Sequence, residues 1–409
     1  MIPDKNPFVE MQEKRIAERV ATSLMRGLPK VAPTIKTNTA EEIKASSLSN
    51  AGDIDDLLTE AVQNKASDLH LSVDSRPRNR VDGDLVEMLG HPIITDDWLS
   101  KQIQKVAPER LWQEFLDNGE ADLSYRLNEE NRFRVNVFKQ RGNIASVFRS
   151  IPTKIKTIEE LGMPEILYDL VKLSRGLILV TGETGSGKST TLTGMIDYIN
   201  DTRQEHIVTI EDPIEFVHKN KKSLVNQREV GMDTFSFAEA LKRVLRQDPD
   251  VILIGELRDP ETISTALTAA ETGHLVFGTL HTQSASKTID RIIDSFPAAQ
   301  QGQVRSQLSD TLKAVISQNL VKKVGGGRVA ATEILVSTSA IAANIREGKT
   351  SQIYNSISTG GAHGMHTLDQ DLKRLVSAGL VEKEEVMNLL VDKTALDGVV
   401  PMRNDEWNY

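Results

Sequence analysis

Aliphatic runs and helical patterns alternate along the second half of the chain. The runs, which are typical of strands buried on both faces, stand at residues 177–180, 207–210, 251–254 and 275–279. The helical patterns stand at residues 190–199, 237–246 and 260–271. Because such alternation builds parallel sheets, it predicts an α/β domain whose sheet is covered by helices. A glycine-rich turn at 325–327 predicts a hairpin between residues 320–324 and 329–336.

The first half follows a different pattern. Helices are expected over residues 54–62 and 98–116, the second interrupted at Pro108, and strands over residues 68–72, 123–127, 132–138 and 144–149. The Asp82-Gly83 pair is a hairpin signal. We therefore expect a smaller α+β domain over residues 53–150, an interdomain joint at 151–158, and the α/β domain over 159–338.

The two ends are expected to be accessory. Residues 1–52 form a polar extension, in which apolar and basic positions between Phe8 and Arg26 recur at helical spacing. This amphipathic helix suits a membrane surface or a partner, although packing on its own protein is the favoured interpretation. Small helices are expected over residues 339–399, at 339–346, 352–358, 367–378 and 382–390, followed by a tail at 400–409.

Composition narrows the possible classes. The 409 residues include no cysteine, so disulfides and thiolate metal sites are excluded. No apolar run reaches the length of a membrane span and the first residues lack a signal-peptide core, so we expect membrane contact to be made only through partners. A net charge of −9 gives no global attraction to nucleic acid, and none is expected to bind directly.

The strongest chemical signal is a phosphate-binding loop. The segment Gly182-Glu183-Thr184-Gly185-Ser186-Gly187-Lys188-Ser189-Thr190 fits G-x-x-x-x-G-K-[ST] between a buried strand and a helix. Its glycines let backbone N–H groups turn toward phosphates. Lys188 is placed to reach the β and γ oxygens and Ser189 to bind Mg²⁺. The sequence therefore predicts an ATP and Mg²⁺ site, with a simple glycine turn as the weaker alternative.

Carboxylates are expected at the same edge of the sheet. The strand at 251–254 is followed by Glu256, and the strand at 207–210 by Glu211, Asp212 and Glu215. Open parallel sheets bind ligands at the carboxyl ends of their strands, where hydrolysis needs a metal-binding and a water-orienting carboxylate. A solvated acidic loop is the alternative for this cluster.

Histidine and arginine leave more alternatives open. His281 follows the strand at 275–279 and is placed to sense a γ-phosphate, although a single histidine is more often structural. Arg132, Arg134, Arg141 and Arg149 lie just before the joint, where charges on a solvated sheet face are the simpler interpretation.

Together these motifs resemble the secretion-superfamily ATPases of type IV pili, and within them the pilus retraction (twitching motility) ATPases. Four blocks stand in the family's order: the phosphate loop at 182–190, the Asp box at 209–216, the Walker-B block at 255–259 and the His box at 272–282. Residues 67–72 and 132–136 also resemble the family's N-terminal domain, so the resemblance runs from about residue 53 to 390.

The resemblance implies a PAS-like N-terminal domain, a RecA-like ATPase domain and a ring of six subunits with ATP between the two domains. It matches Glu215 to the general base, Glu256 to the Walker-B glutamate near Mg²⁺ and His281 to the His-box histidine. Arg134 and Arg149 match arginines that reach the nucleotide from the N-terminal domain. It also implies a cytoplasmic motor that acts on an inner-membrane platform protein at that membrane's cytoplasmic face.

One helix departs from the retraction branch. The branch carries Ala-Ile-Arg-Asn-Leu-Ile-Arg-Glu, and this chain has Ala-Ile-Ala-Ala-Asn-Ile-Arg-Glu at residues 340–347. The absence of cysteine favours retraction, because assembly ATPases typically carry a four-cysteine zinc site. We expect a pilus retraction ATPase. The alternatives are a motor for pilus assembly, type II secretion or conjugation, a DNA-binding RecA-like translocase, and a regulatory ATP-binding module without turnover.

Overall fold

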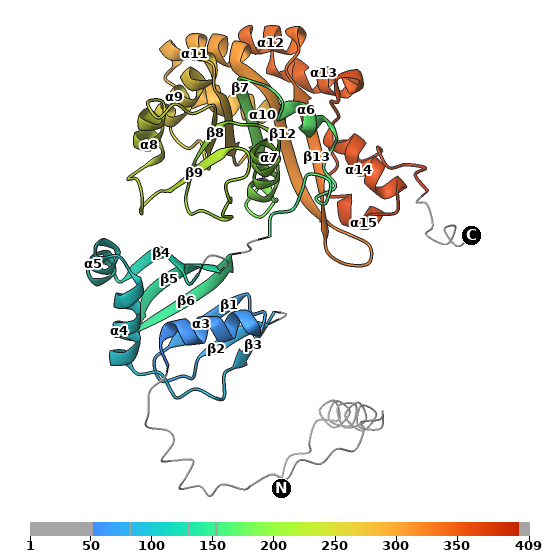
Figure 1. The fold of residues 1–409 in the computed structure, drawn as a ribbon. Coiled ribbons are helices and arrows are strands. Elements are labelled where there is room, and N and C mark those ends of the chain that lie inside the picture. Colours follow the sequence, from blue (N-terminus) through green and yellow to red (C-terminus); the bar gives the residue numbers. More distant parts are fainter. Residues whose placement is uncertain (1–51, 82, 129–130, 152–153, 401–409) are drawn as a thin grey trace, which may run out of the picture. The chain divides into compact units, whose positions relative to one another are not determined.

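The computed structural model describes residues 52–81, 83–128, 131–151 and 154–400 (Figure 1). Most of the predicted extension at 1–52, and the tail except residue 400, lie outside the described residues. The described strands form two separate sheets, one of six strands and one of seven. The strands of the smaller sheet lie between residues 68 and 151, and those of the larger sheet between residues 176 and 336.

The smaller sheet is antiparallel and has the order β3-β2-β1-β6-β5-β4. Its elements are α3 (Ile54–Gln63), β1 (Asp68–Ser72), β2 (Arg78–Val81), β3 (Asp84–Glu87), α4 (Asp96–Val106), α5 (Glu109–Asn118), β4 (Glu120–Arg126), β5 (Arg132–Gln140) and β6 (Asn143–Ile151). Fully buried side chains such as Leu57 of α3, Leu99 of α4 and Val135 of β5 share one core. Pro108, the helix-breaking residue, separates α4 from α5 as expected.

The larger sheet has the order β13-β12-β7-β11-β10-β8-β9, and its pairs are parallel except for β12 with β13. Its strands are β7 (Gly176–Thr181), β8 (His206–Glu211), β9 (Leu224–Glu229), β10 (Val251–Ile254), β11 (Leu275–Leu280), β12 (Leu312–Lys322) and β13 (Arg328–Val336). The helices that cover its two faces include α6 (Ile166–Leu170), α7 (Lys188–Thr202), α8 (Phe237–Val244), α9 (Pro260–Glu271), α10 (Ala285–Asp294) and α11 (Ala298–Thr311).

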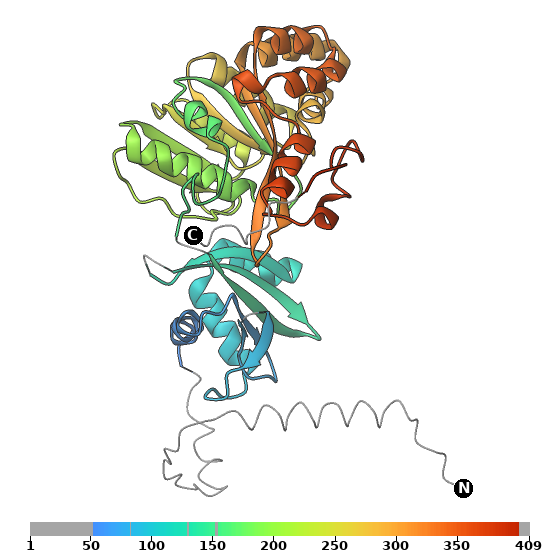
Figure 2. The ribbon, with the colours of Figure 1, turned by 90° about the vertical axis from the view of Figure 1, so that its right-hand side faces the viewer.

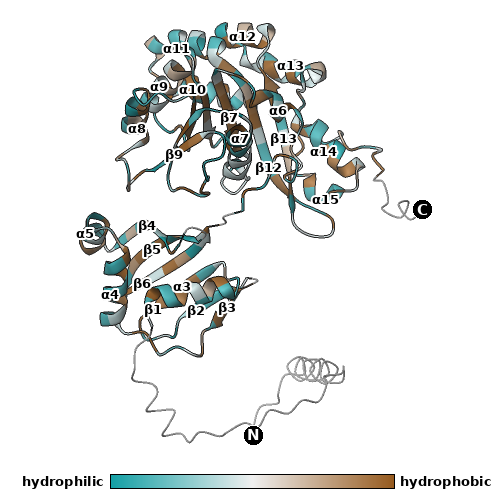
Figure 3. Cartoon of the chain, in the orientation of Figure 1, coloured by the Kyte–Doolittle hydropathy of each residue, from teal (hydrophilic) through white to brown (hydrophobic). Residues whose placement is uncertain are grey.

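Helices cover both faces of the larger sheet. Leu177 and Leu179 of β7 pack in a core that includes side chains of α8 to α11. Their neighbours Ile178 and Val180 pack in a second core with side chains of α6 and α7. Because successive strand residues point to opposite faces of the sheet, the aliphatic run of β7 is buried on both faces. Figure 3 shows β7, in the middle of this sheet, as predominantly hydrophobic. The predicted α/β class with a smaller α+β part is confirmed.

The last part of the chain packs beside the β12–β13 hairpin (Figure 2). It contains α12 (Ser339–Arg346), η2 (Thr350–Gln352), α13 (Ile353–Thr359), η3 (Gly361–His363), α14 (Leu368–Ser377) and α15 (Lys383–Val386). The helix expected over 382–390 is therefore only one turn long. The Asp369 carboxylate accepts hydrogen bonds from the backbone of Val391 and Asp392 at 2.9 and 2.8 Å, which fixes the chain in a non-helical path there.

Candidate nucleotide site

A cavity of about 400 Å³ lies at the carboxyl ends of β7, β8, β10 and β11. This is the edge at which open parallel sheets bind ligands. The cavity is lined by Thr184, Gly185, Gly187, Lys188, Ser189, Thr190, Leu192, Thr193, Glu211, Asp212, Pro213, Glu215, Phe237, Leu253, Gly255, Glu256, Arg258, Thr279, His281, Leu320 and Arg328. The structure thus brings the phosphate loop together with Glu215, Glu256 and His281.

The phosphate loop has the backbone that its glycines permit. Gly182, Gly185 and Gly187 have φ of +142°, +80° and +90°, values that side chains disfavour. A Cβ on Gly182 would stand 2.3 Å from the Gln318 carbonyl oxygen, so no larger residue fits there. The α7 helix begins immediately afterwards at Lys188. The loop therefore presents the N-terminus of a long helix to the cavity, which is a site for phosphate.

Two polar groups of the loop are poised for an anion. The buried Ser186 hydroxyl has no hydrogen-bond partner among the described residues. The Lys188 Nζ donates to the carbonyls of Gly182 and Glu183 at 2.9 and 3.0 Å. Burial lowers the pKa of Lys188, while the nearby Glu256 and Glu215 act in the opposite direction. A phosphate would supply an acceptor for the hydroxyl and a counter-charge for the ammonium.

Glu256, which also lines the cavity, forms the centre of a charged cluster. Its Oε2 lies 2.7 Å from Arg258 Nη2, and its Oε1 lies 3.5 Å from His281 Nε2. Burial raises the pKa of Glu256, but Arg258 and His281 lower it by more, so the net pKa is below its usual range. The carboxylate is therefore ionised at neutral pH and suited to a cation or to the water around one.

The chain between β8 and β9, residues 212–223, is called here the Asp-box loop. Within it, Glu215 is exposed and lines the cavity. Glu211, at the end of β8, instead accepts hydrogen bonds from Thr209 Oγ1 at 2.6 Å and from Gln227 Nε2 at 3.0 Å. Burial raises the pKa of Glu211. The two glutamates are thus distinguished by their surroundings, and Glu215 is the one left available to water.

Several residues at the site carry no recognisable sequence signal. The Gln318 Nε2 donates to the Ser186 carbonyl at 2.7 Å, and the Gln283 Nε2 donates to Glu183 Oε1 at 2.7 Å. Gln318 reaches the loop because β12 pairs with β7, with Ser317 opposite Thr181. Arg328 and Leu320 line the cavity from the same hairpin. A sequence motif does not reveal such contacts, because they depend on which strands become neighbours.

Arg134 and Arg149 lie on β5 and β6, directly opposite each other in the smaller sheet. Arg149 Nε lies 2.8 Å from Asp68 Oδ1 of β1. All the described residues that line the cavity lie between residues 184 and 328. Arg134 and Arg149 are therefore not among its lining residues. Their assignment to the nucleotide stays a prediction.

Metal sites built from protein ligands alone, and membrane spans, are both absent from the part of the chain that the structure describes. In that part, no group of three or more histidine, aspartate or glutamate side chains could hold a metal ion by itself. None of the described helices has the length and apolar character of a membrane span.

The parallel sheet, the glycine loop at the start of α7 and the carboxylates facing it define a P-loop ATPase. A model of the family described as "Type II/IV secretion system protein" matches residues 45–388, and the chain belongs to that family. Within that family, the chain is similar to the type IV pilus retraction ATPases.

Two relatives and one solved structure carry this similarity to retraction ATPases. The chain is 54% identical over 332 residues to the "Type IV pilus retractation ATPase PilT" of Pseudomonas aeruginosa, covering 81% of this chain and 96% of that protein. It is 50% identical over 329 residues to the "Twitching motility protein" of Neisseria gonorrhoeae, covering 80% and 87%. The crystal structure of the pilus retraction motor PilT with bound ADP matches with a TM-score of 0.78 and 49% identity, covering 83% and 98%.

Proposed function

We propose that this chain is the ATP-hydrolysing motor that powers retraction of type IV pili. One observation carries the proposal: a single cavity joins the phosphate loop, Glu215, Glu256 and His281. The names of the relatives at 54% and 50% identity support the retraction role, and the ADP bound to the similar PilT crystal structure supports the nucleotide.

Within this motor, residues 182–190 bind the phosphates of ATP. Lys188 exchanges its two carbonyl acceptors for the β and γ oxygens, and Ser186 gains the acceptor that it lacks among the described residues. Ser189 and Glu256, which both line the cavity, would hold Mg²⁺. Such an ion neutralises the charge that develops on the transferred phosphoryl group. Phosphate and water oxygens would supply the other ligands of this ion.

Glu215 acts as the general base that takes a proton from the attacking water. It is exposed to the cavity, whereas Glu211 is occupied by two hydrogen bonds and Glu256 by Arg258 and His281. His281, whose Nε2 lies 3.5 Å from Glu256 Oε1, senses whether the γ-phosphate is present through this contact. The contacts that each side chain already makes support this division of roles.

The larger arrangement is also proposed. Residues 53–150 form the PAS-like domain, 151–158 the joint, 159–338 the RecA-like domain and 339–399 the C-terminal helices. Six subunits form a ring, in which closing of the joint brings Arg134 and Arg149 to the nucleotide. The ring is cytoplasmic and works at the inner membrane through a platform protein and other pilus components, without binding nucleic acid.

The test of turnover is the Glu215→Gln variant. We expect it to bind ATP with nearly unchanged affinity and to lose roughly 100-fold or more in kcat, because the amide keeps the shape but removes the base. The exposed Glu159→Gln, outside the cavity, is the matched control and keeps wild-type kcat. Equal hydrolysis by both variants, measured by phosphate release, would remove Glu215 from this role.

A further inference from the structure

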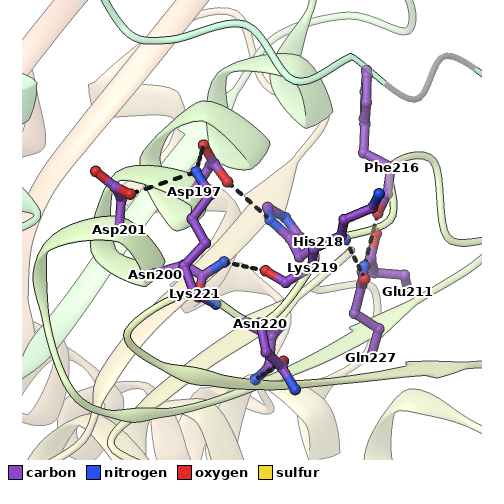
Figure 4. A network of polar contacts seen from close by, with 11 residues as sticks. Asp197, Asn200, Asp201, Glu211, Phe216, His218, Lys219, Asn220, Lys221 and Gln227 are labelled. Carbon is purple, nitrogen blue, oxygen red and sulfur yellow. Dashed lines mark hydrogen bonds and ion pairs between the residues drawn. The ribbon is translucent and has the colours of Figure 1, made fainter.

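The side chain of Gln227, on the edge strand β9, holds the Asp-box loop at more than one point (Figure 4). Its Nε2 donates to the Phe216 carbonyl at 2.8 Å and to Glu211 Oε1 at 3.0 Å. Its Oε1 accepts from the His218 backbone N–H at 2.8 Å. Both ends of one amide are therefore used to tie the end of β8 to the middle of the loop.

The strand register explains this reach. β9 pairs in parallel with β8, and Gln227 stands opposite Thr209. Thr209 and Gln227 donate to the same oxygen of Glu211. Because burial disfavours the charge on Glu211, these two donors stabilise a carboxylate that would otherwise be costly. Gln227 thus donates one hydrogen bond to Glu211, and its amide also makes hydrogen bonds to the backbone of the Asp-box loop.

Glu215 lies between fixed backbone groups. On one side of it, the Ile214 N–H donates to Glu229 Oε2 at 3.2 Å. On the other side, Gln227 binds Phe216 and His218. Glu229 and Gln227 are two residues apart on β9, so the same strand positions the chain before and after Glu215. The backbone of Glu215 is therefore held on both sides by residues of β9.

The later part of the loop is held independently by α7. The His218 ring is buried with Nδ1 3.9 Å from Asp197 Oδ1, and Lys221 Nζ lies 2.9 Å from Asp197 Oδ2. Asn200 Nδ2 donates to the Lys219 carbonyl at 2.8 Å (Figure 4). These contacts do not involve Gln227. Loss of its amide should loosen the segment around Glu215 without releasing the whole loop.

We propose that Gln227 is a positioning residue for ATP hydrolysis. By fixing the backbone on the C-terminal side of Glu215, it keeps that carboxylate at the distance and angle from which it takes the proton of the attacking water. The inference rests on the proposed role of Glu215. Small misplacements of a catalytic group are expensive, on the order of 100-fold for 1 Å.

Two substitutions separate the functions of the amide. Gln227→Met keeps the approximate length and removes all three hydrogen bonds. Gln227→Glu keeps an acceptor for the His218 N–H but places negative oxygens against Glu211 and the Phe216 carbonyl. We expect kcat to fall roughly 10- to 100-fold in Gln227→Met and further in Gln227→Glu, with KM and the dissociation constant for ATP changed less than about 2-fold. Gln303→Met, at an exposed position of α11, is the matched control.

The decisive experiment is a double-mutant cycle with Glu215→Gln, measured as single-turnover release of labelled phosphate by the full chain. If Gln227 acts through Glu215, then Gln227→Met lowers the rate in the wild-type background and has little further effect in the Glu215→Gln background. The Glu211→Gln, Gln227→Glu pair restores one donor and one acceptor between these side chains, and should recover part of the lost rate.

The outcomes distinguish this inference from the function on which it rests. Wild-type turnover by Glu215→Gln would overturn the proposed base. A large effect of Glu215→Gln together with an equal fold loss from Gln227→Met in both backgrounds would overturn the positioning role alone. Normal kcat in Gln227→Met, or a loss of ATP affinity that parallels the loss of kcat, would overturn it as well. If Gln227→Met does not fold, the Gln227→Glu and Glu211→Gln pair provides the cycle.

Discussion

At the scale of single residues, Lys188 is the most informative side chain of the cavity. It is buried beside the loop, its pKa is lowered by that burial, and two backbone carbonyls hold it where phosphate is expected. An ammonium in this position contributes through charge-assisted hydrogen bonds made to the nucleotide. Its energetic effect is therefore largest when ATP is bound.

We predict that Lys188→Ala weakens ATP binding by about 1.5–3 kcal/mol, on the order of 10- to 100-fold, because it removes hydrogen bonds to a charged ligand. Turnover should fall below detection. Titration with a fluorescent ATP analogue measures the first effect and phosphate release the second. Lys172→Ala, which removes an exposed lysine paired with Asp169, is the control and should change neither. Unaltered affinity in Lys188→Ala would contradict the phosphate role.

The sequence predicts the site best where a motif fixes both the backbone conformation and the chemistry. The loop at 182–190 and the acids after β8 and β10 are predictable from local pattern, and the structure brings residues of both to one cavity. Gln318, Gln283 and Gln227, by contrast, belong to no such motif. Each is a neutral amide whose partner lies on another element, so its significance depends on strand order and register, which no local pattern contains.

At the scale of elements, one buried carboxylate joins the β13 strand to two helices. Glu333 Oε1 accepts from the Ala285 N–H at the start of α10 at 2.8 Å, and its carboxylate also interacts with the backbone N–H of Leu368, the first residue of α14. Burial raises the pKa of Glu333, and the nearby Asp369 acts in the same direction. The α10 helix begins soon after His281, so Glu333 connects the end of the His box with the C-terminal helices.

The raised pKa gives a signed prediction for stability. Ionisation of Glu333 is harder in the folded than in the unfolded state, so its charge costs stability as the pH rises above its ordinary value of 4.5. Glu333→Gln does not ionise. The difference in melting temperature, variant minus wild type, should therefore become more positive between pH 5 and pH 8. Any constant effect of losing an acceptor cancels in this comparison. Calorimetry measures both melting temperatures at each pH. A melting-temperature difference that stays constant or falls as the pH rises would contradict the prediction.

Asn200 offers a second prediction for an element, because it fastens the Asp-box loop to α7. Its amide donates to the Lys219 carbonyl at 2.8 Å, and its Oδ1 accepts from the Lys221 N–H at 3.1 Å. Asn200→Ala leaves both backbone groups without this partner and should cost about 1–3 kcal/mol of unfolding free energy. Hydrogen exchange should accelerate mainly in residues 219–223. Thr202→Ala, near the exposed end of the same helix, is the comparison. Unchanged exchange in this segment would show that other contacts hold the loop.

The elements were predictable where the hydrophobic pattern was regular. The strands β7, β8, β10 and β11 and the helix α9 were predicted closely, because they combine aliphatic runs or amphipathic faces with clear ends. β9, α10 and α11 were not predicted. β9 is an edge strand with polar positions, and α11 is rich in glutamine and serine, so tertiary contacts rather than local pattern decide their structure. β12 also begins earlier than expected, at Leu312.

At the scale of the whole molecule, the direction of force is the finest part of the proposal. The helix that departs from the retraction branch is α12, and it keeps Ile341 and Ile345 fully buried. The substituted positions Ala342, Ala343 and Asn344 are all partly exposed. The substitutions therefore leave the packing face intact, and they alter the part of α12 that is available for contact with something else.

We predict that bacteria lacking this protein carry excess surface pili and do not twitch, because assembly continues while retraction stops. The intact chain should restore normal piliation, and Lys188→Ala should not, since an empty phosphate loop cannot drive the motor. Electron microscopy of pili together with a surface motility assay measures both effects, and Lys172→Ala controls for expression of a substituted chain. Cells without pili would identify an assembly motor instead. Unchanged piliation would direct the search to secretion or conjugation, and the exposed positions of α12 would then be the first surface to compare with those motors.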